Sequence, residues 1–314
     1  KVEATVASAD PWFRPTDVCV APDGAVFISD WYDPGVGGHR VVDLKRGRIY
    51  RLAPAGDKPQ KIAVDVSTPA GVAEAFASPA QSVRYLAYTA LKQQGDKALP
   101  VLQSIYKSDD PILKARALWL LGGIPGEGEA AVRTALEDID SNFRTLAWCI
   151  LRRYGADLNE PLNLMAKDRS PQVRREVAAA LEQWPADPAI ETLAAFFRKY
   201  DGKDRWMLEA LGIGARGKEN ALYARLLDNF TVKWSSRFGQ LLWEFRPSDA
   251  LPSLVTLLKD DSLSVPERVE VLDALSAQAK PEAALAVAEF SQATGQPQEL
   301  AEKSFARLSQ QLYS

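Results

Sequence analysis

The stretch Asp168-Arg-Ser-Pro-Gln-Val-Arg174 contains the signals that decide the fold of this chain. Serine followed by proline is typical of a helix start, because proline suits the first helical turn and serine favours the capping position. Arg174 then lies in the first turn of the predicted helix. The same succession of a polar turn, a helix start and an arginine recurs along the chain, which indicates internal repeats.

Seven arginines that open predicted helices are separated by 28 to 32 residues. The helix after each arginine carries apolar residues at helical spacing, as between Val83 and Leu91. A second helix is predicted before each arginine, so the unit is a helical hairpin of about 31 residues. One hairpin cannot bury its apolar face alone, so neighbouring hairpins must stack. The arginines are Arg84, Arg116, Arg144, Arg174, Arg205, Arg237 and Arg268.

Residues 1–66 have a different pattern, with short apolar runs between turn signals, which predicts an antiparallel sheet of three to five strands. The turn Ala21-Pro-Asp-Gly24 supplies a proline to set φ and a glycine to accept a positive φ. Apolar residues on both faces predict that the sheet meets the first helical hairpin on one face and other protein on the other. The predicted strands are Val2–Ala7, Thr16–Val20, Ala25–Asp30, Gly47–Leu52 and Lys61–Val66.

Composition excludes several classes of protein. The 38 basic and 41 acidic residues give a net charge of −3, which is unlike a basic nucleic-acid binder. The sequence has no run of 18 apolar residues, so it predicts no membrane span. Two cysteines, Cys19 and Cys149, with His39 as the one histidine, cannot form a zinc cluster or a c-type haem motif. Both cysteines have apolar neighbours and are predicted to be buried, inert thiols.

Residues 68–314 resemble HEAT-type repeats, whose second helix often begins with a D-x-x-x-V-R-like turn. The predicted fold is therefore mainly α: a HEAT-like α-solenoid of helical hairpins with a small N-terminal antiparallel β module. We place the β module at residues 1–66 and the repeat array at residues 67–314, with a C-terminal helical cap.

The β module resembles the last blade of a β-propeller. Three stretches carry the resemblance: Asp10-Pro-Trp-Phe-Arg-Pro-Thr-Asp17, Ala21–His39 with its Pro-Asp-Gly and Asp-Trp-Tyr sequences, and Arg46-Gly-Arg-Ile-Tyr-Arg51. They are similar to large membrane-bound dehydrogenases of planctomycetes and verrucomicrobia, whose propellers resemble those of quinone-dependent sugar dehydrogenases. The family order is propeller, HEAT-like repeats and often a c-type haem domain.

This resemblance implies a periplasmic or secreted parent with a quinone-type cofactor, calcium or c-type haem. The chain has only one blade-like segment, where a closed propeller needs several. It also lacks the haem motif. We therefore expect no cofactor and no catalytic residues in this chain, and no enzyme activity from it alone. Because it opens with Lys1, it looks like a piece of something larger.

The loop that follows the second predicted strand is the main candidate for chemistry. It offers Asp30, Trp31, Asp33 and His39, which could hold a metal or face a quinone or sugar; the identity of any metal stays unknown. The favoured alternative is that Asp30 caps the strand end, Trp31 packs between blades and the loop glycines form a turn.

Two further features have structural and functional interpretations. Aspartates precede several of the repeated arginines, as Asp110 precedes Arg116, which favours Asp–Arg pairs between successive hairpins over a column of sites for an anionic ligand. Most tryptophans are expected in packing contacts. Trp234 and Trp243 flank Arg237 and are the second candidate for a partner surface.

The sequence thus predicts a non-catalytic scaffold that docks a propeller and an electron-transfer partner. Its partners are other protein segments, such as the propeller and a cytochrome c domain, or a second copy of the chain. Two alternatives stay open: a part of an oxidoreductase whose loop at residues 30–39 contributes to a quinone, sugar or metal site, and a free-standing peptide-binding adaptor.

Overall fold

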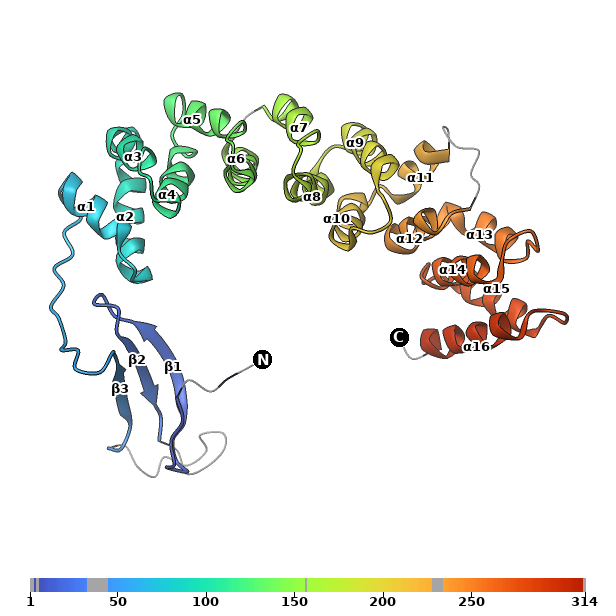
Figure 1. Ribbon diagram of the computed structural model, residues 1–314, viewed down its shortest axis with the longest axis horizontal. Coiled ribbons are helices and arrows are strands. Elements are labelled where there is room, and N and C mark those ends of the chain that lie inside the picture. Colours follow the sequence, from blue (N-terminus) through green and yellow to red (C-terminus); the bar gives the residue numbers. More distant parts are fainter. Residues whose placement is uncertain (1–2, 4–5, 33–44, 156, 228–233, 313–314) are drawn as a thin grey trace. The chain divides into compact units, whose positions relative to one another are not determined.

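The fold is mainly helical, with one three-stranded antiparallel sheet near the N-terminus (Figure 1), which confirms the predicted fold class. The computed structural model describes residues 3, 6–32, 45–155, 157–227 and 234–312. No helix in this part of the chain is long and apolar enough to cross a membrane. The chain divides into two compact units, Lys1–Thr134 with Arg153–Gly155 and Ala135–Arg152 with Ala156–Ser314. The boundary predicted at residues 66/67 stays a prediction.

The sheet is a meander in the order β1-β2-β3, formed by β1 (Pro15–Val20), β2 (Val26–Asp30) and β3 (Arg48–Leu52). Gly24 has a φ of 84° in the turn between β1 and β2, the left-handed conformation that glycine accepts without strain. The strand predicted at Lys61–Val66 is wrong. Val64 and Val66 instead pack against the apolar core of the first helices.

Of the predicted strand Val2–Ala7, residues 2, 4 and 5 lie outside the described residues, and Val6 and Ala7 form no strand.

The first unit contains stacked helical hairpins after the sheet. Helix α1 packs on α2, α3 on α4, and α2 on α4. Phe76, Leu91, Leu102 and Leu121 are almost fully buried in the core between these helices. The helices are α1 (Pro69–Ala77), α2 (Gln81–Gln94), α3 (Leu99–Tyr106), α4 (Pro111–Leu121) and α5 (Glu127–Ala135), with a 3₁₀ turn at Gly95–Ala98.

In the second unit, α8, α10, α12, α14 and α16 pack one against the next, side by side in Figure 1. Gly214 permits the close approach of α8 and α10, because a Cβ there would lie 2.2 Å from the carbonyl oxygen of Ala178. The helices are α6 (Ser141–Tyr154), which begins in this unit, α7 (Asn159–Met165), α8 (Pro171–Ala180), α9 (Ala186–Lys199), α10 (Arg205–Ala215), α11 (Glu219–Leu227), α12 (Ser236–Phe245), α13 (Leu251–Leu258), α14 (Val265–Ser276), α15 (Pro281–Gln292) and α16 (Gln298–Leu312).

Three arginines of the repeat make the same hydrogen bonds. Arg84, Arg144 and Arg174 are each the fourth residue of a helix. Each donates from Nη1 to the two carbonyl oxygens six and five residues earlier, at 2.5 to 3.1 Å. We call this arrangement the turn clamp. It satisfies carbonyl groups of the turn and fixes the direction in which the helix starts.

The predicted Asp–Arg pairs between hairpins exist, but their partners differ from the expected ones. Asp168 accepts two hydrogen bonds from Arg144 of the preceding hairpin, at 2.7 and 2.9 Å, rather than pairing with Arg174. Asp204 likewise accepts from Arg175 at 2.8 Å rather than pairing with the adjacent Arg205. Each aspartate therefore joins one hairpin to the one before it.

The Arg144–Asp168 pair is almost completely buried, with side-chain exposures of 6% and 5%. Burial alone would raise the pKa of Asp168, but hydrogen bonds from Arg144 and the Ser170 amide outweigh it and hold that pKa below its usual 3.8. A lowered carboxyl pKa stabilises the fold above the usual value, and this stabilisation is lost as the pH falls through the folded-state pKa.

We expect Asp168→Ala to lower the free energy of unfolding by about 2–3 kcal/mol at neutral pH, because it leaves a buried guanidinium without its carboxylate. Urea unfolding followed by circular dichroism measures this loss. The exposed pair of Arg205 and Glu209 supplies the control: Arg205→Ala should cost less than about 1 kcal/mol. The cost of Asp168→Ala should shrink below about pH 4, and a cost that stays constant into acid would contradict the assigned pairing.

Candidate functional site

Asp30, a residue of the candidate loop, ends β2 and is only 3% exposed. Its Oδ1 accepts hydrogen bonds from the backbone amides of Arg14, at 2.8 Å, and Tyr32, at 3.0 Å. Its Oδ2 accepts from Arg48 Nε at 2.7 Å, and Arg48 Nη1 also donates to Asp10 Oδ2 at 3.0 Å. The carboxylate therefore joins the end of β2 to the start of β3 and to the segment before β1.

Aromatic rings surround the guanidinium group of Arg48. It lies 4.4 Å from the ring centroid of Tyr32 and 5.5 Å from that of Tyr50. Trp12 packs against Tyr32, and Phe13 packs edge-on against Tyr50. We call these residues, with Asp30 and Asp10, the Asp30 cluster. It joins the strands of the sheet at the end where β2 stops and β3 begins.

Burial of Asp30 would raise its pKa, but the hydrogen bonds from Arg14, Arg48 and Tyr32 outweigh it and hold that pKa below its usual value. Both carboxylate oxygens are thus committed to donors of the chain itself. This arrangement suits a structural anion better than a metal ligand or a catalytic base.

The structure places the four predicted loop residues differently. Asp30 is buried in its cluster, while the side chain of Trp31 is 67% exposed. Asp33 and His39 lie outside the described residues. Within the described ranges, no group of three or more His, Cys, Asp or Glu side chains gathers to hold a metal ion. Both carboxylate oxygens of Asp30 accept from donors of the chain, so Asp30 does not fit as a ligand of a metal such as calcium, and cofactor binding by the loop stays a prediction.

Sequence reasoning did not single out Arg48 or Asp10 as members of the same cluster. Both lie in the stretches that resemble a propeller blade, but they are 38 residues apart. Only the antiparallel pairing, which sets Arg48 opposite Asp30, brings them together.

The sheet exposes apolar side chains on both faces. All six residues of β1 are exposed, and Val18 reaches 62%. The register places Tyr50 on the same face as Val18, which we call the Tyr50 face. Ile49, at 74% exposure, lies on the opposite face with Phe27, which we call the Ile49 face. Among the described residues, β1 and β3 each have one unpaired edge.

The two candidate tryptophans have different surroundings. Trp234 is 8% exposed, and its ring packs so closely on Gly239 that a Cβ there would lie 2.7 Å from it. Trp243 on α12 is 45% exposed, with the guanidinium of Arg246 5.9 Å from its ring centroid. Only Trp243 presents a surface to a partner, and partner binding stays a prediction.

The cysteines also differ. Cys19 is exposed on β1, so its predicted burial is wrong. The reason is that every residue of this strand is exposed. Cys149 is partly buried, and its pKa is raised to about 11 by that burial and by the neighbouring Glu176 carboxylate. The Cys149 thiol is therefore protonated and unreactive at neutral pH.

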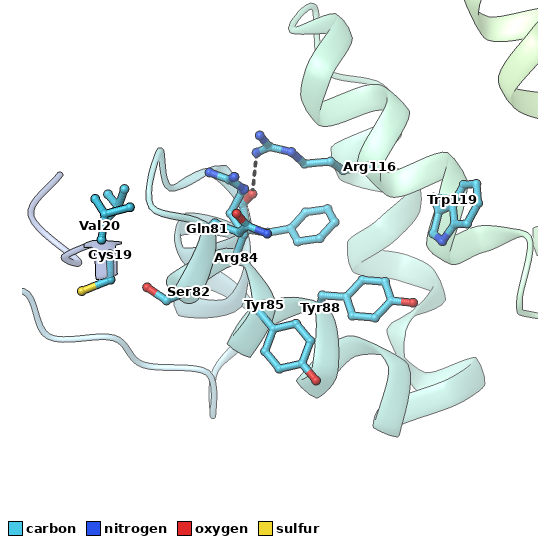
Figure 2. Close-up of a pocket in the computed structure, with 11 residues that line it drawn as sticks. Cys19, Val20, Gln81, Ser82, Arg84, Tyr85, Tyr88, Arg116 and Trp119 are labelled. Carbon is cyan, nitrogen blue, oxygen red and sulfur yellow. Dashed lines mark hydrogen bonds between the residues drawn. The ribbon is translucent and has the colours of Figure 1, made fainter. Parts of the chain in front are cut away.

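Each unit has grooves on its surface. One groove of about 730 Å³ belongs to the first unit and is lined by residues of β1, α1, α2 and α4 (Figure 2). The second unit has a polar groove of about 590 Å³ beside α10 and α12, and another of about 450 Å³ beside α8 and α10.

Comparisons with known proteins say little about function. Residues 3–56, about one sixth of the chain, match a family model described as a domain of unknown function, DUF7133. No curated protein matches the chain. The chain is similar to a solved structure of human deoxyhypusine hydroxylase in complex with glycerol, at 19% identity over 78% of this chain and 96% of that chain. The TM-score of 0.31 is too low to support any conclusion about fold or function.

We expect Asp30→Asn to loosen the β module, because an amide cannot accept from all the donors that surround Asp30 and forfeits the charge that pairs with Arg48. Hydrogen exchange should become faster at the amides of β2 and β3, while the helical circular dichroism signal stays unchanged. Asp17→Asn, at an exposed position of β1, is the matched control. Unchanged exchange in Asp30→Asn would show that the carboxylate does not organise the sheet.

Proposed function

We propose that this chain is a non-catalytic scaffold and interaction part of a larger periplasmic dehydrogenase. In that assembly the β module continues a propeller-like sheet structure, and the helical repeats dock an electron-transfer partner such as a haem-bearing domain. The dehydrogenase parent, its compartment and its quinone, calcium or haem cofactor rest on the sequence resemblance alone.

The open sheet is the observation that carries this proposal. A three-stranded sheet is stable when one face is buried against something else, and here β1 is exposed along its length. Ile49 is among the most exposed large apolar residues in the described chain. Unpaired edges with apolar faces are typical of sheets that other strands complete.

The family match supports a separable module. Its limits, residues 3–56, enclose the whole sheet and stop before the first helix. A unit of this size buries little surface of its own, so it depends on its neighbours for stability.

The helical array offers surfaces suited to docking. Trp206 on α10 is 64% exposed and Trp243 on α12 is 45% exposed, and these two helices pack against each other. Exposed tryptophans are enriched where proteins bind one another, because a large rigid ring buries much area at small entropic cost.

Self-association tests the open sheet when no partner is present. We expect the chain to show a mass above 34.5 kDa by light scattering as its concentration rises. Ile49→Glu should shift this association to at least about tenfold higher concentration, because it places a charge on the Ile49 face. Ile139→Glu, at an 87% exposed isoleucine of the second unit, is the matched control and should leave the association unchanged.

Light scattering and hydrogen exchange on the same samples can also contradict the proposal. A chain that stays monomeric, and whose β1 and β3 amides are nonetheless strongly protected from hydrogen exchange, would show that the module closes on itself. The proposal would then fail.

We also expect the purified chain to show no haem Soret band and no turnover of sugars with an artificial electron acceptor. The sequence lacks a C-x-x-C-H motif, and one blade cannot supply a site that several blades form. Absorbance and dye-reduction assays measure this, with a known sugar dehydrogenase as positive control. Robust turnover by the chain alone would refute the scaffold role.

A further inference from the structure

The 730 Å³ groove of the first unit has two arginines on its wall. Arg84 comes from α2 and Arg116 from α4, and Figure 2 shows their guanidinium groups on the same side of the groove. Burial of Arg116, together with the nearby charge of Arg84, lowers the pKa of its guanidinium, and the charge of Asp110 only partly opposes this. Two like charges are thus held together, an arrangement that an anion would relieve.

Neither arginine contacts a carboxylate in the described part of the chain. Arg84 donates to the carbonyl oxygens of Ser78 and Pro79, and Arg116 to that of Phe76 at 3.0 Å. Asp110, the nearest acid in sequence before Arg116, instead caps α4 by accepting from the amides of Ile112 and Leu113. The remaining guanidinium N–H groups are available to a ligand.

The repeat does not account for Arg116. The fourth helical residue carries the repeated basic group, and in α4 that residue is Lys114. Arg116 is the sixth residue, where the other helices that carry this basic group have leucine or glutamate, as at Leu86, Leu146 and Glu176. Arg116 is therefore a cation additional to the repeat. It lies near Arg84, which forms a turn clamp, but does not form one itself.

Some of the other repeat arginines have acidic partners, whereas Arg174 and Arg237 bond backbone carbonyl oxygens. Arg144 bonds Asp168, and Arg268 bonds Asp261 at 2.7 Å. In those hairpins the guanidinium charge is neutralised within the fold. The Arg84–Arg116 pair differs in that two arginines without a carboxylate contact line the same groove.

Aromatic side chains line the same groove. Tyr85 and Tyr88 lie on α2, and Trp119 lies one turn after Arg116 on α4 (Figure 2). Tyr85 is 66% exposed although it is a large aromatic residue. Val18 and Val20 of β1 also line the groove. The surface thus combines a cationic pair with an open apolar wall.

We propose that this groove binds an acidic peptide segment of a partner protein, whose carboxylates pair with Arg84 and Arg116 while an apolar side chain lies against Tyr85, Tyr88 and Trp119. The site is separate from the scaffold role, because its arginines and aromatic residues lie on α2 and α4 and do not need a completed sheet.

The shape favours a peptide over a small molecule. Small-molecule sites enclose most of their ligand, whereas this groove leaves Tyr85 largely exposed. An extended chain can present a carboxylate and an apolar side chain at neighbouring positions, and planar guanidinium groups match carboxylates through paired hydrogen bonds.

Fluorescence anisotropy of labelled peptides with the full chain tests the site. The probes are heptapeptides of Gly, Asp, Asp, a central residue, Asp, Asp and Gly, with Phe, Trp, Leu or Ala at the centre. Twins with Asn in place of Asp are neutral. We expect the acidic peptides with an apolar centre to bind, the neutral twins not to bind, and Ala at the centre to weaken binding.

Substitutions assign the binding to the groove. Arg116→Gln should weaken binding about tenfold, since it removes charged hydrogen bonds, and Arg116→Lys should restore part of it. Tyr85→Ala should weaken the Phe peptide and leave the Ala peptide unchanged. Arg205→Gln removes one charge from a 79% exposed side chain of α10 and is the matched control. Circular dichroism confirms that each variant keeps its helices.

Several results would overturn the proposal. They are equal binding of the acidic peptides and their neutral twins, binding that survives Arg116→Gln, and no binding of any acidic peptide. Binding confined to phosphopeptides or to inorganic phosphate would also overturn it, because it would assign the arginine pair to a different anion. Failure of self-association in the light-scattering experiment leaves this test unaffected.

Discussion

Hydrogen bonds from arginine to the carbonyl groups of a turn fix the start of three helices of the array. Arg84, Arg144 and Arg174 each bond the turn before their own helix in the same way. Every hairpin must reverse direction and then present its apolar face to its neighbours, and a turn with unsatisfied carbonyls would leave that direction undefined. An aspartate such as Asp168 also accepts a hydrogen bond from an arginine of the preceding hairpin, which ties neighbouring hairpins together.

The proposed peptide groove contains an arginine, Arg116, that does not form a turn clamp. Arg144 bonds both a turn carbonyl and a carboxylate, so its hydrogen bonds and its charge are satisfied within the fold. Arg116 makes one hydrogen bond to a backbone carbonyl and contacts no carboxylate within the described residues, and it lines the groove. A repeat protein can thus acquire a ligand site by adding one residue to a scaffold that already holds its neighbours in place.

The β module is held together differently from the helical array. At one end of the strands a buried carboxylate, Asp30, pairs with the half-buried Arg48 beside aromatic rings, and all of β1 is exposed. A buried carboxylate with several donors gives a small sheet a defined geometry, although it contributes less burial than an apolar core would. Such a sheet keeps its shape while leaving apolar faces for other protein, which agrees with a module that functions as part of something larger.

The sequence by itself determined the hairpin repeat, the β-to-α change along the chain and the three main strands, because helix starts, turns and apolar periodicity are local signals. It could not determine which residues meet across the turns: Asp168 bonds Arg144 and not Arg174, and Lys61–Val66 packs on helices instead of pairing. It also could not show that Asp30 accepts hydrogen bonds from Arg14, Tyr32 and Arg48. Nor could it show that Arg116 contacts no carboxylate in the described chain. These are distances between residues far apart in sequence, and only the tertiary structure decides them, since charge and hydrogen-bond partners are set by which elements pack together.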